Sequence, residues 1–174
     1  HCMTVAYLDD QLKRSLRNLG LDCVDLMYLH NAVEGQIKDV SKEKFLENLK
    51  SVFELYEQKR KEGKIKFYGM ATWECFRVSS DNPQYLSLQD TVELAKKVGG
   101  ENHGFRFIQL PFNMYYDQAL LAKNQTLDGR LVSILEAAVK LNIGVFTSVP
   151  LMQGRLLVPG AMPEFNELKP SLRA

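Results

Sequence analysis

The sequence predicts an α/β protein that forms part of a (β/α)8 TIM barrel, with about four parallel strands and helices between them. Two observations carry this prediction. Four short apolar runs with strand character alternate with longer segments in which apolar residues recur at helical spacing. The apolar runs also begin about 40 residues apart, which leaves room for one helix and its loops in each interval.

Each predicted strand is a short run dominated by apolar side chains. The strands are expected at residues 24–29, 65–70, 107–111 and 143–149. Strands that alternate with long helices are joined by crossover connections, and such connections make neighbouring strands parallel. We therefore expect the four strands to be parallel and adjacent in chain order.

The predicted helices precede and separate the strands, at residues 7–19, 41–62, 87–98 and 129–141. The second helix has the clearest pattern, since five large side chains recur every three or four residues: Phe45, Leu49, Val52, Phe53 and Tyr56. Ser41 supplies a side-chain cap at its start. Residues 73–86 are predicted to form an inserted loop.

Two architectures fit this order of elements: a doubly wound open sheet and an arc of a barrel. No GxGxxG or GxxxxGK[ST] motif follows any predicted strand, so the doubly wound alternative has no phosphate-binding loop to support it. Polar residues lie at the carboxyl end of every predicted strand, where barrel enzymes build their active sites. These residues are His30, Asn31, Thr72, Gln109, Asn113 and Ser148.

Composition excludes several functional classes. Lys and Arg number 22 against 21 Asp and Glu, so no broad basic surface for nucleic acid is expected. No apolar run reaches the roughly 18 residues of a membrane span, and the segment HCMTVAYLDD lacks the features of a signal peptide. The three cysteines are widely spaced and form no metal-binding motif. We expect a cytoplasmic protein without a metal site, a nucleic-acid partner or a membrane partner.

Four motifs in order resemble the aldo-keto reductase superfamily. The segment 15–21 leading into 24–30 resembles that family's third barrel helix and fourth strand, and 63–69 resembles the approach to its fifth strand. Residues 107–113 are similar to its sixth strand, and 150–157 to the loop after its seventh. The resemblance implies an NADP(H)-dependent oxidoreductase that reduces aldehydes or ketones to alcohols, or catalyses the reverse reaction, on small molecules.

The resemblance also implies roles for individual residues. His30 matches the catalytic histidine that helps to orient the substrate, and Gln109 matches the glutamine that holds the nicotinamide carboxamide. Thr72 stands where many members carry an asparagine for the same carboxamide, and Ser148 stands where many carry an aromatic that stacks on the nicotinamide. The turn after the last strand would present backbone groups to the pyrophosphate through Pro150, Leu151, Gln153 and Gly154. In a barrel, His30, Thr72, Gln109 and Ser148 would share one rim cleft.

Several catalytic residues of the family are expected outside this sequence. The family places its Asp, Tyr and Lys on the first three strands, upstream of the matched motifs, whereas Asp25, Lys66 and Tyr68 belong to strand motifs and are interpreted as structural. We therefore expect residues 1–174 to form a single partial barrel domain, truncated at both ends and inactive alone. The alternatives are a non-catalytic, cofactor-binding regulatory subunit and a scaffold of the same fold. The oligomeric state stays open.

Overall fold

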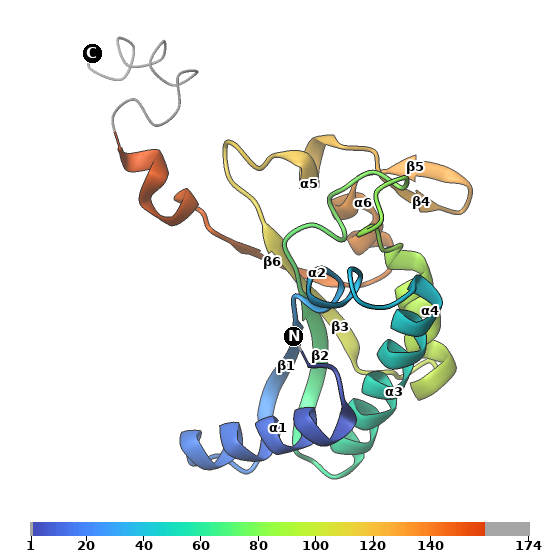
Figure 1. Ribbon diagram of the computed structural model, residues 1–174, viewed down its shortest axis with the longest axis vertical. Helices are drawn as coiled ribbons and strands as arrows, with labels where there is room; N and C mark the ends of the chain where they lie inside the picture. The colour runs from blue at the N-terminus through green and yellow to red at the C-terminus, as the bar shows by residue number, and fades with distance from the viewer. Residues whose placement is uncertain (1, 159–174) are drawn as a thin grey trace.

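The computed structural model describes residues 2–158 and contains a four-stranded parallel sheet with helices packed against one side (Figure 1). The strands lie side by side in the order β1-β2-β3-β6 and are all parallel. Their bounds are Val24–His30 (β1), Ile65–Ala71 (β2), Phe105–Pro111 (β3) and Gly144–Ser148 (β6). The predicted arc of parallel strands in chain order is confirmed.

The helices that precede and separate the strands bury their apolar stripes. They are α1 (Val5–Leu19), α3 (Lys42–Lys61), α4 (Leu88–Gly99) and α6 (Ile134–Lys140). Ser41 accepts a hydrogen bond from the backbone N–H of Lys44 and caps α3, as the sequence predicts. The segments that follow the strand ends hold shorter helices: α2 (Ala32–Gln36), α5 (Gln118–Leu121) and the 3₁₀-helix η1 (Met152–Leu157).

The prediction of the last helix, 129–141, is wrong for its first residues. Residues 125–132 form a hairpin instead, with strands β4 (Gln125–Leu127) and β5 (Arg130–Val132). The turn residues Asp128 and Gly129 both have positive φ, 50° and 76°, which is the geometry that Asp-Gly favours in a two-residue hairpin. The helix begins only after Ser133, whose hydroxyl and Glu136 form a reciprocal cap.

Alternation along the strands gives the sheet two different faces. The outer face meets the helices, and an aromatic cluster fills this contact: the rings of Phe53 and Tyr68 lie 5.2 Å apart, and those of Phe53 and Phe105 lie 5.4 Å apart. The inner face carries a row of phenylalanines, Phe67, Phe107 and Phe146, with ring centroids 5.8 and 5.7 Å apart. Phe67 and Phe146 are 39% and 51% exposed, so this face is apolar but open to solvent.

A buried carboxylate joins the elements at the amino ends of the strands. Glu57 of α3 accepts hydrogen bonds from the hydroxyl of Tyr68 (3.0 Å), the backbone N–H of Gly104 (2.6 Å) and the guanidinium of Arg60 (2.6 Å). Arg60 also donates to the carbonyl oxygens of Lys66 and Asn102. Each of these polar groups is therefore paired, as burial requires.

Among residues 2–158, none of the helices is both long and apolar enough to cross a membrane. In the same range, no three His, Cys, Asp or Glu side chains gather in a way that could hold a metal ion.

Candidate active site

One row of side chains crosses the sheet at its carboxyl end. The strand register pairs His30 with Ala71, Ala71 with Gln109 and Gln109 with Phe146. Residues paired in this way point to the same side of a parallel sheet. All four therefore belong to the inner face, and the methyl group of Ala71 separates His30 from Gln109. Ser148 lies on the same face, two residues beyond Phe146 and paired with Pro111.

The backbone of Gln109 is hydrogen-bonded to a neighbouring strand end, whereas its side-chain amide is available to a ligand. Its carbonyl oxygen accepts a hydrogen bond from the backbone N–H of Thr72 at 2.8 Å. Within residues 2–158, no group forms a hydrogen bond with the Gln109 side-chain amide, which is half-buried on the inner face. An amide in this state can both donate to and accept from a ligand.

The structure does not bring the side chain of Thr72 into this row. Thr72 follows Ala71 on the chain, and it is 5% exposed. Its hydroxyl lies beside the buried thiol of Cys75: burial raises the pKa of that thiol well above its usual range, and the Thr72 hydroxyl acts in the opposite direction. Thr72 is connected to the row through its backbone N–H, which donates a hydrogen bond to the carbonyl oxygen of Gln109.

Glu34 fixes the segment that follows β2. One carboxylate oxygen of Glu34 accepts hydrogen bonds from three successive backbone N–H groups, of Trp73 (2.9 Å), Glu74 (2.7 Å) and Cys75 (3.3 Å). Glu34 belongs to α2, directly after His30 and Asn31. The carboxylate therefore ties the segment carrying His30 to the segment carrying Trp73. Sequence reasoning missed Glu34, since nothing in the local pattern indicates partners about 40 residues away.

Asn113 clamps two other segments together. Its amide nitrogen donates to the carbonyl oxygen of Val149 at 2.8 Å, and its amide oxygen accepts from the backbone N–H groups of Tyr115 and Tyr116, both at 2.8 Å. Val149 has φ 52°, which a β-branched residue rarely adopts. The segment after β3 and the turn after β6 are therefore held against each other at a strained point of the chain.

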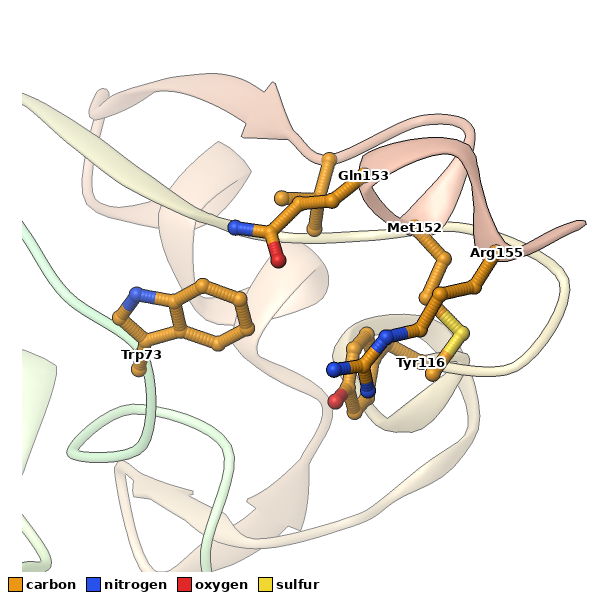
Figure 2. Close-up of a pocket in the computed structure, with 6 residues that line it drawn as sticks. Trp73, Tyr116, Met152, Gln153 and Arg155 are labelled. Atoms are coloured by element: carbon orange, nitrogen blue, oxygen red, sulfur yellow. The ribbon is translucent and has the colours of Figure 1, made fainter.

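A pocket of about 200 Å³ opens between these segments (Figure 2). Trp73 and Tyr116 form an aromatic side with their rings edge to face, 6.1 Å apart. The opposite side comes from the turn after β6; the full lining is Trp73, Tyr116, Val149, Met152, Gln153 and Arg155. In Figure 2 the Gln153 amide extends toward the Trp73 indole, and the Arg155 guanidinium lies beside the Tyr116 ring.

A comparison of the sequence with protein families identifies the family of this chain. The Aldo/keto reductase family profile matches residues 1–159. The chain belongs to the aldo/keto reductase family. The expected resemblance is thereby confirmed over nearly the whole chain.

Solved structures with this fold are much longer than the matched region. A putative 2,5-diketo-D-gluconic acid reductase B matches with a TM-score of 0.52 and 16% identity, covering 86% of this chain and 39% of that structure. The holo form of the aldo-keto reductase AKR11C1 from Bacillus halodurans matches with a TM-score of 0.50 and 18% identity, covering 88% and 38%. A comparison with curated protein sequences gave no match. The chain thus spans about two fifths of these structures and shares that part of their fold.

The turn that resembles the family's pyrophosphate loop is built from unusual backbone. Met152, Gln153 and Gly154 all have positive φ, at 52°, 58° and 85°. The N–H of Met152 donates to Val149, and the N–H of Gly154 donates to Leu151. These two N–H groups are therefore used within the turn. Pro150 and Leu151 lie on the surface, and of the four predicted turn residues only Gln153 lines the pocket.

Proposed function

We propose that this chain forms the cofactor- and substrate-facing part of an NADP(H)-dependent oxidoreductase that interconverts small aldehydes or ketones and their alcohols. The row His30–Ala71–Gln109–Phe146 carries this proposal. It brings the two residues that match the family's functional positions to one face, at the strand ends where barrel enzymes act. The accessible Gln109 amide fits a carboxamide, and the exposed ring of Phe146 provides an apolar neighbour.

Each residue would act on a stated atom. When bound, NADPH supplies a hydride to the carbonyl carbon of the substrate. His30 would donate an imidazole N–H hydrogen bond to the carbonyl oxygen, which orients it and stabilises the negative charge that develops there. Gln109 would hold the nicotinamide carboxamide through both of its amide groups, and Ser148 would lie beside the same ring without stacking on it.

The proton for the alkoxide would come from outside this chain. The family's acid is a Tyr whose acidity is tuned by a Lys and an Asp, and the resemblance places all three upstream of the matched motifs. Tyr28 lies on the inner face two residues before His30, but burial raises its pKa to about 12, which disfavours proton release there. We therefore propose that the chain works within a longer barrel, in keeping with its coverage of about two fifths of the related structures.

A second function has specific support: a non-catalytic, cofactor-binding regulatory subunit or scaffold. Ser148 cannot stack on a nicotinamide, and the Thr72 side chain is buried beside Cys75. His30 favours the enzyme, since a scaffold has no use for a substrate-orienting imidazole. For either function we propose a cytoplasmic location, which the unpaired state of Cys2, Cys23 and Cys75 supports.

Cofactor binding is tested on the 174-residue chain by NADPH fluorescence titration. Gln109→Ala should weaken binding about tenfold, the loss expected for one or two amide hydrogen bonds. Gln11→Ala, on α1, is the matched control and should leave the affinity unchanged. Absence of NADPH binding by the parent chain at high cofactor concentration would contradict the proposal of a cofactor site within these residues.

Catalysis is tested in the longer protein that includes the upstream strands. His30→Ala should lower kcat/KM for carbonyl reduction about a hundredfold, because one donor aimed at the developing oxyanion is lost. Its NADPH affinity should stay within about twofold of the parent, since the imidazole faces the substrate. Unaltered turnover would favour the non-catalytic alternative.

A further inference from the structure

Three residues that line the pocket between Trp73 and the turn after β6 are held by neighbouring side chains. Glu34 accepts from the backbone N–H of Trp73, and the side chain of Arg77 donates to its carbonyl oxygen at 2.7 Å. The guanidinium of Arg77 also lies 5.0 Å from the centroid of the Tyr116 ring. Asn113 holds the backbones of both Tyr116 and Val149. Supporting contacts that fix the backbones of Trp73, Tyr116 and Val149 in this way are typical of a preorganised binding site.

Arg77 itself is not available to a ligand. It is 6% exposed, and its donors are taken by Trp73, by the side-chain oxygen of Gln118 at 2.7 Å and by Glu74 at 3.4 Å. Arg77 therefore holds the backbone of Trp73 and packs against the ring of Tyr116. The charge that a ligand would meet therefore comes from another residue of the lining.

Arg155 supplies that charge. It lines the pocket and is exposed, and within residues 2–158 its guanidinium has no ion-pair or hydrogen-bond partner. An unpaired guanidinium beside aromatic rings fits a carboxylate, which it can bind through two parallel hydrogen bonds. The rings of Trp73 and Tyr116 and the thioether of Met152 fit a planar apolar group.

The pocket also borders the row that carries His30 and Gln109. Trp73 comes two residues after Ala71, Tyr116 five residues after Pro111, and Val149 one residue after Ser148. Each wall therefore begins where a strand of the row ends. The pocket and the row therefore lie at the same carboxyl end of the sheet, so a substrate bound at the row can extend toward the pocket.

We propose that this pocket is a specificity subsite for carbonyl substrates that join an aromatic ring to a carboxylate, such as aryl keto acids. The ring packs against the aromatic side that Trp73 and Tyr116 form together, and the carboxylate pairs with Arg155. The volume of about 200 Å³ suits one small ring with its substituent. This assignment rests on the proposed function, because it takes the ligand to be the substrate of that reaction.

The test uses Trp73, the only tryptophan of the chain. Its indole N–H resonance in NMR spectra of the 174-residue chain reports on the pocket without any cofactor. Benzoylformate should shift this resonance in a saturable way. It should bind about tenfold more tightly than acetophenone, which lacks the carboxylate, or pyruvate, which lacks the ring.

Arg155→Gln should weaken benzoylformate binding about tenfold and leave acetophenone binding within about twofold, because only the charged partner is lost. Arg155→Lys keeps the charge but not the planar fork, so its affinity should fall between those of the parent and Arg155→Gln. Arg17→Gln removes the same charge from an exposed position near the end of α1, at the opposite end of the molecule (Figure 1), and should change nothing. Because Arg155 and Arg17 are exposed, these variants keep the fold, which circular dichroism checks.

Three results would overturn the subsite: no saturable shift with benzoylformate, equal affinity in the parent and Arg155→Gln, or competition between NADPH and benzoylformate. The last would assign the pocket to the cofactor. Failure of the proposed function is distinguishable, because it is measured by NADPH binding and turnover, whereas benzoylformate binding requires neither.

Discussion

The two ends of the parallel sheet differ in whether they hold unpaired polar side chains. Both ends have paired ones, which at the carboxyl end include Glu34 and Asn113. At the amino end, the Glu57 carboxylate accepts three hydrogen bonds, and Arg60 donates to Glu57 and to two carbonyl oxygens. At the carboxyl end, the amide of Gln109 and the guanidinium of Arg155 have no hydrogen-bond partner within residues 2–158. The amino end is thus closed to ligands and the carboxyl end is open to them.

Because of this difference, polar groups at one end of the strands contribute to stability, and polar groups at the other end are available for binding. Paired and buried groups fix how α3 meets β2 and β3, and losing one of them leaves its partners unpaired. Accessible groups contribute little to folding, but they are ready to bind a ligand without first breaking an internal bond. Substitutions at the two ends should therefore differ in what they change, which the following predictions test.

The largest effect is expected for Glu57→Ala. It removes the acceptor shared by Tyr68, Gly104 and Arg60, and the free energy of unfolding should fall by about 3 kcal/mol or more. Urea denaturation of the chain measures the change. Glu54→Ala is the matched control on the same helix, where the exposed carboxylate lies 3.6 Å from Lys50, and it should stay within about 0.5 kcal/mol of the parent. Equal losses in the two variants would contradict a special role for Glu57.

Gly69→Ala should have the next largest effect. A Cβ atom at this position would lie 2.1 Å from the carbonyl oxygen of Phe107, so β2 and β3 would have to separate. We expect a loss of about 2 kcal/mol in thermal or urea unfolding. Gly129→Asn is the contrasting change, since that turn has positive φ and open space, and it should cost much less. A harmless Gly69→Ala would show that the register between β2 and β3 is different.

A smaller effect, dependent on pH, is expected from His103 at the amino end. Burial and the neighbouring charge of Arg106 lower its pKa to about 4, from an ordinary value of 6.5. The unfolded chain therefore binds a proton between these values that the folded chain does not, and stability should fall as the pH is lowered from about 6.5 toward 4. His103→Asn should reduce this slope in urea titrations at a series of pH values. An unchanged slope would assign it to other groups.

The smallest effect on stability is expected for Gln109→Ala at the carboxyl end. Since no internal hydrogen bond is lost from its side chain, the free energy of unfolding should change by less than about 1 kcal/mol. The same variant should weaken NADPH binding, so it affects binding and spares folding. A loss of stability as large as that of Glu57→Ala would remove the distinction between the two ends of the sheet.

Much of the fold could be predicted from sequence because it depends on local patterns. Apolar runs such as 24–29 and the stripe of Phe45, Leu49 and Val52 state which residues are buried, and the alternation of strands and helices dictates parallel pairing. The prediction failed at 129–132, where the turn chemistry of Asp128-Gly129 outweighed the helical spacing of the residues that follow.

The candidate site was predictable only in part. His30 and Gln109 were found from motifs, and strand alternation is enough to place them on one face. Thr72 follows the end of β2, where its direction depends on the loop, and its side chain is buried beside Cys75. Glu34 and Asn113 act through hydrogen bonds to segments 36 to 41 residues away, which no local pattern specifies.

The row across the rim has a consequence for how such a protein can change. Each strand contributes one side chain to it, and the residue just before each of these belongs to a second row that faces the helices: Leu29, Met70, Ile108 and Val145. One set of positions therefore packs against the helices, and the adjacent set carries the side chains of the candidate site. Single residues of the rim row can therefore be exchanged, one strand at a time, while the residues that pack against the helices are retained.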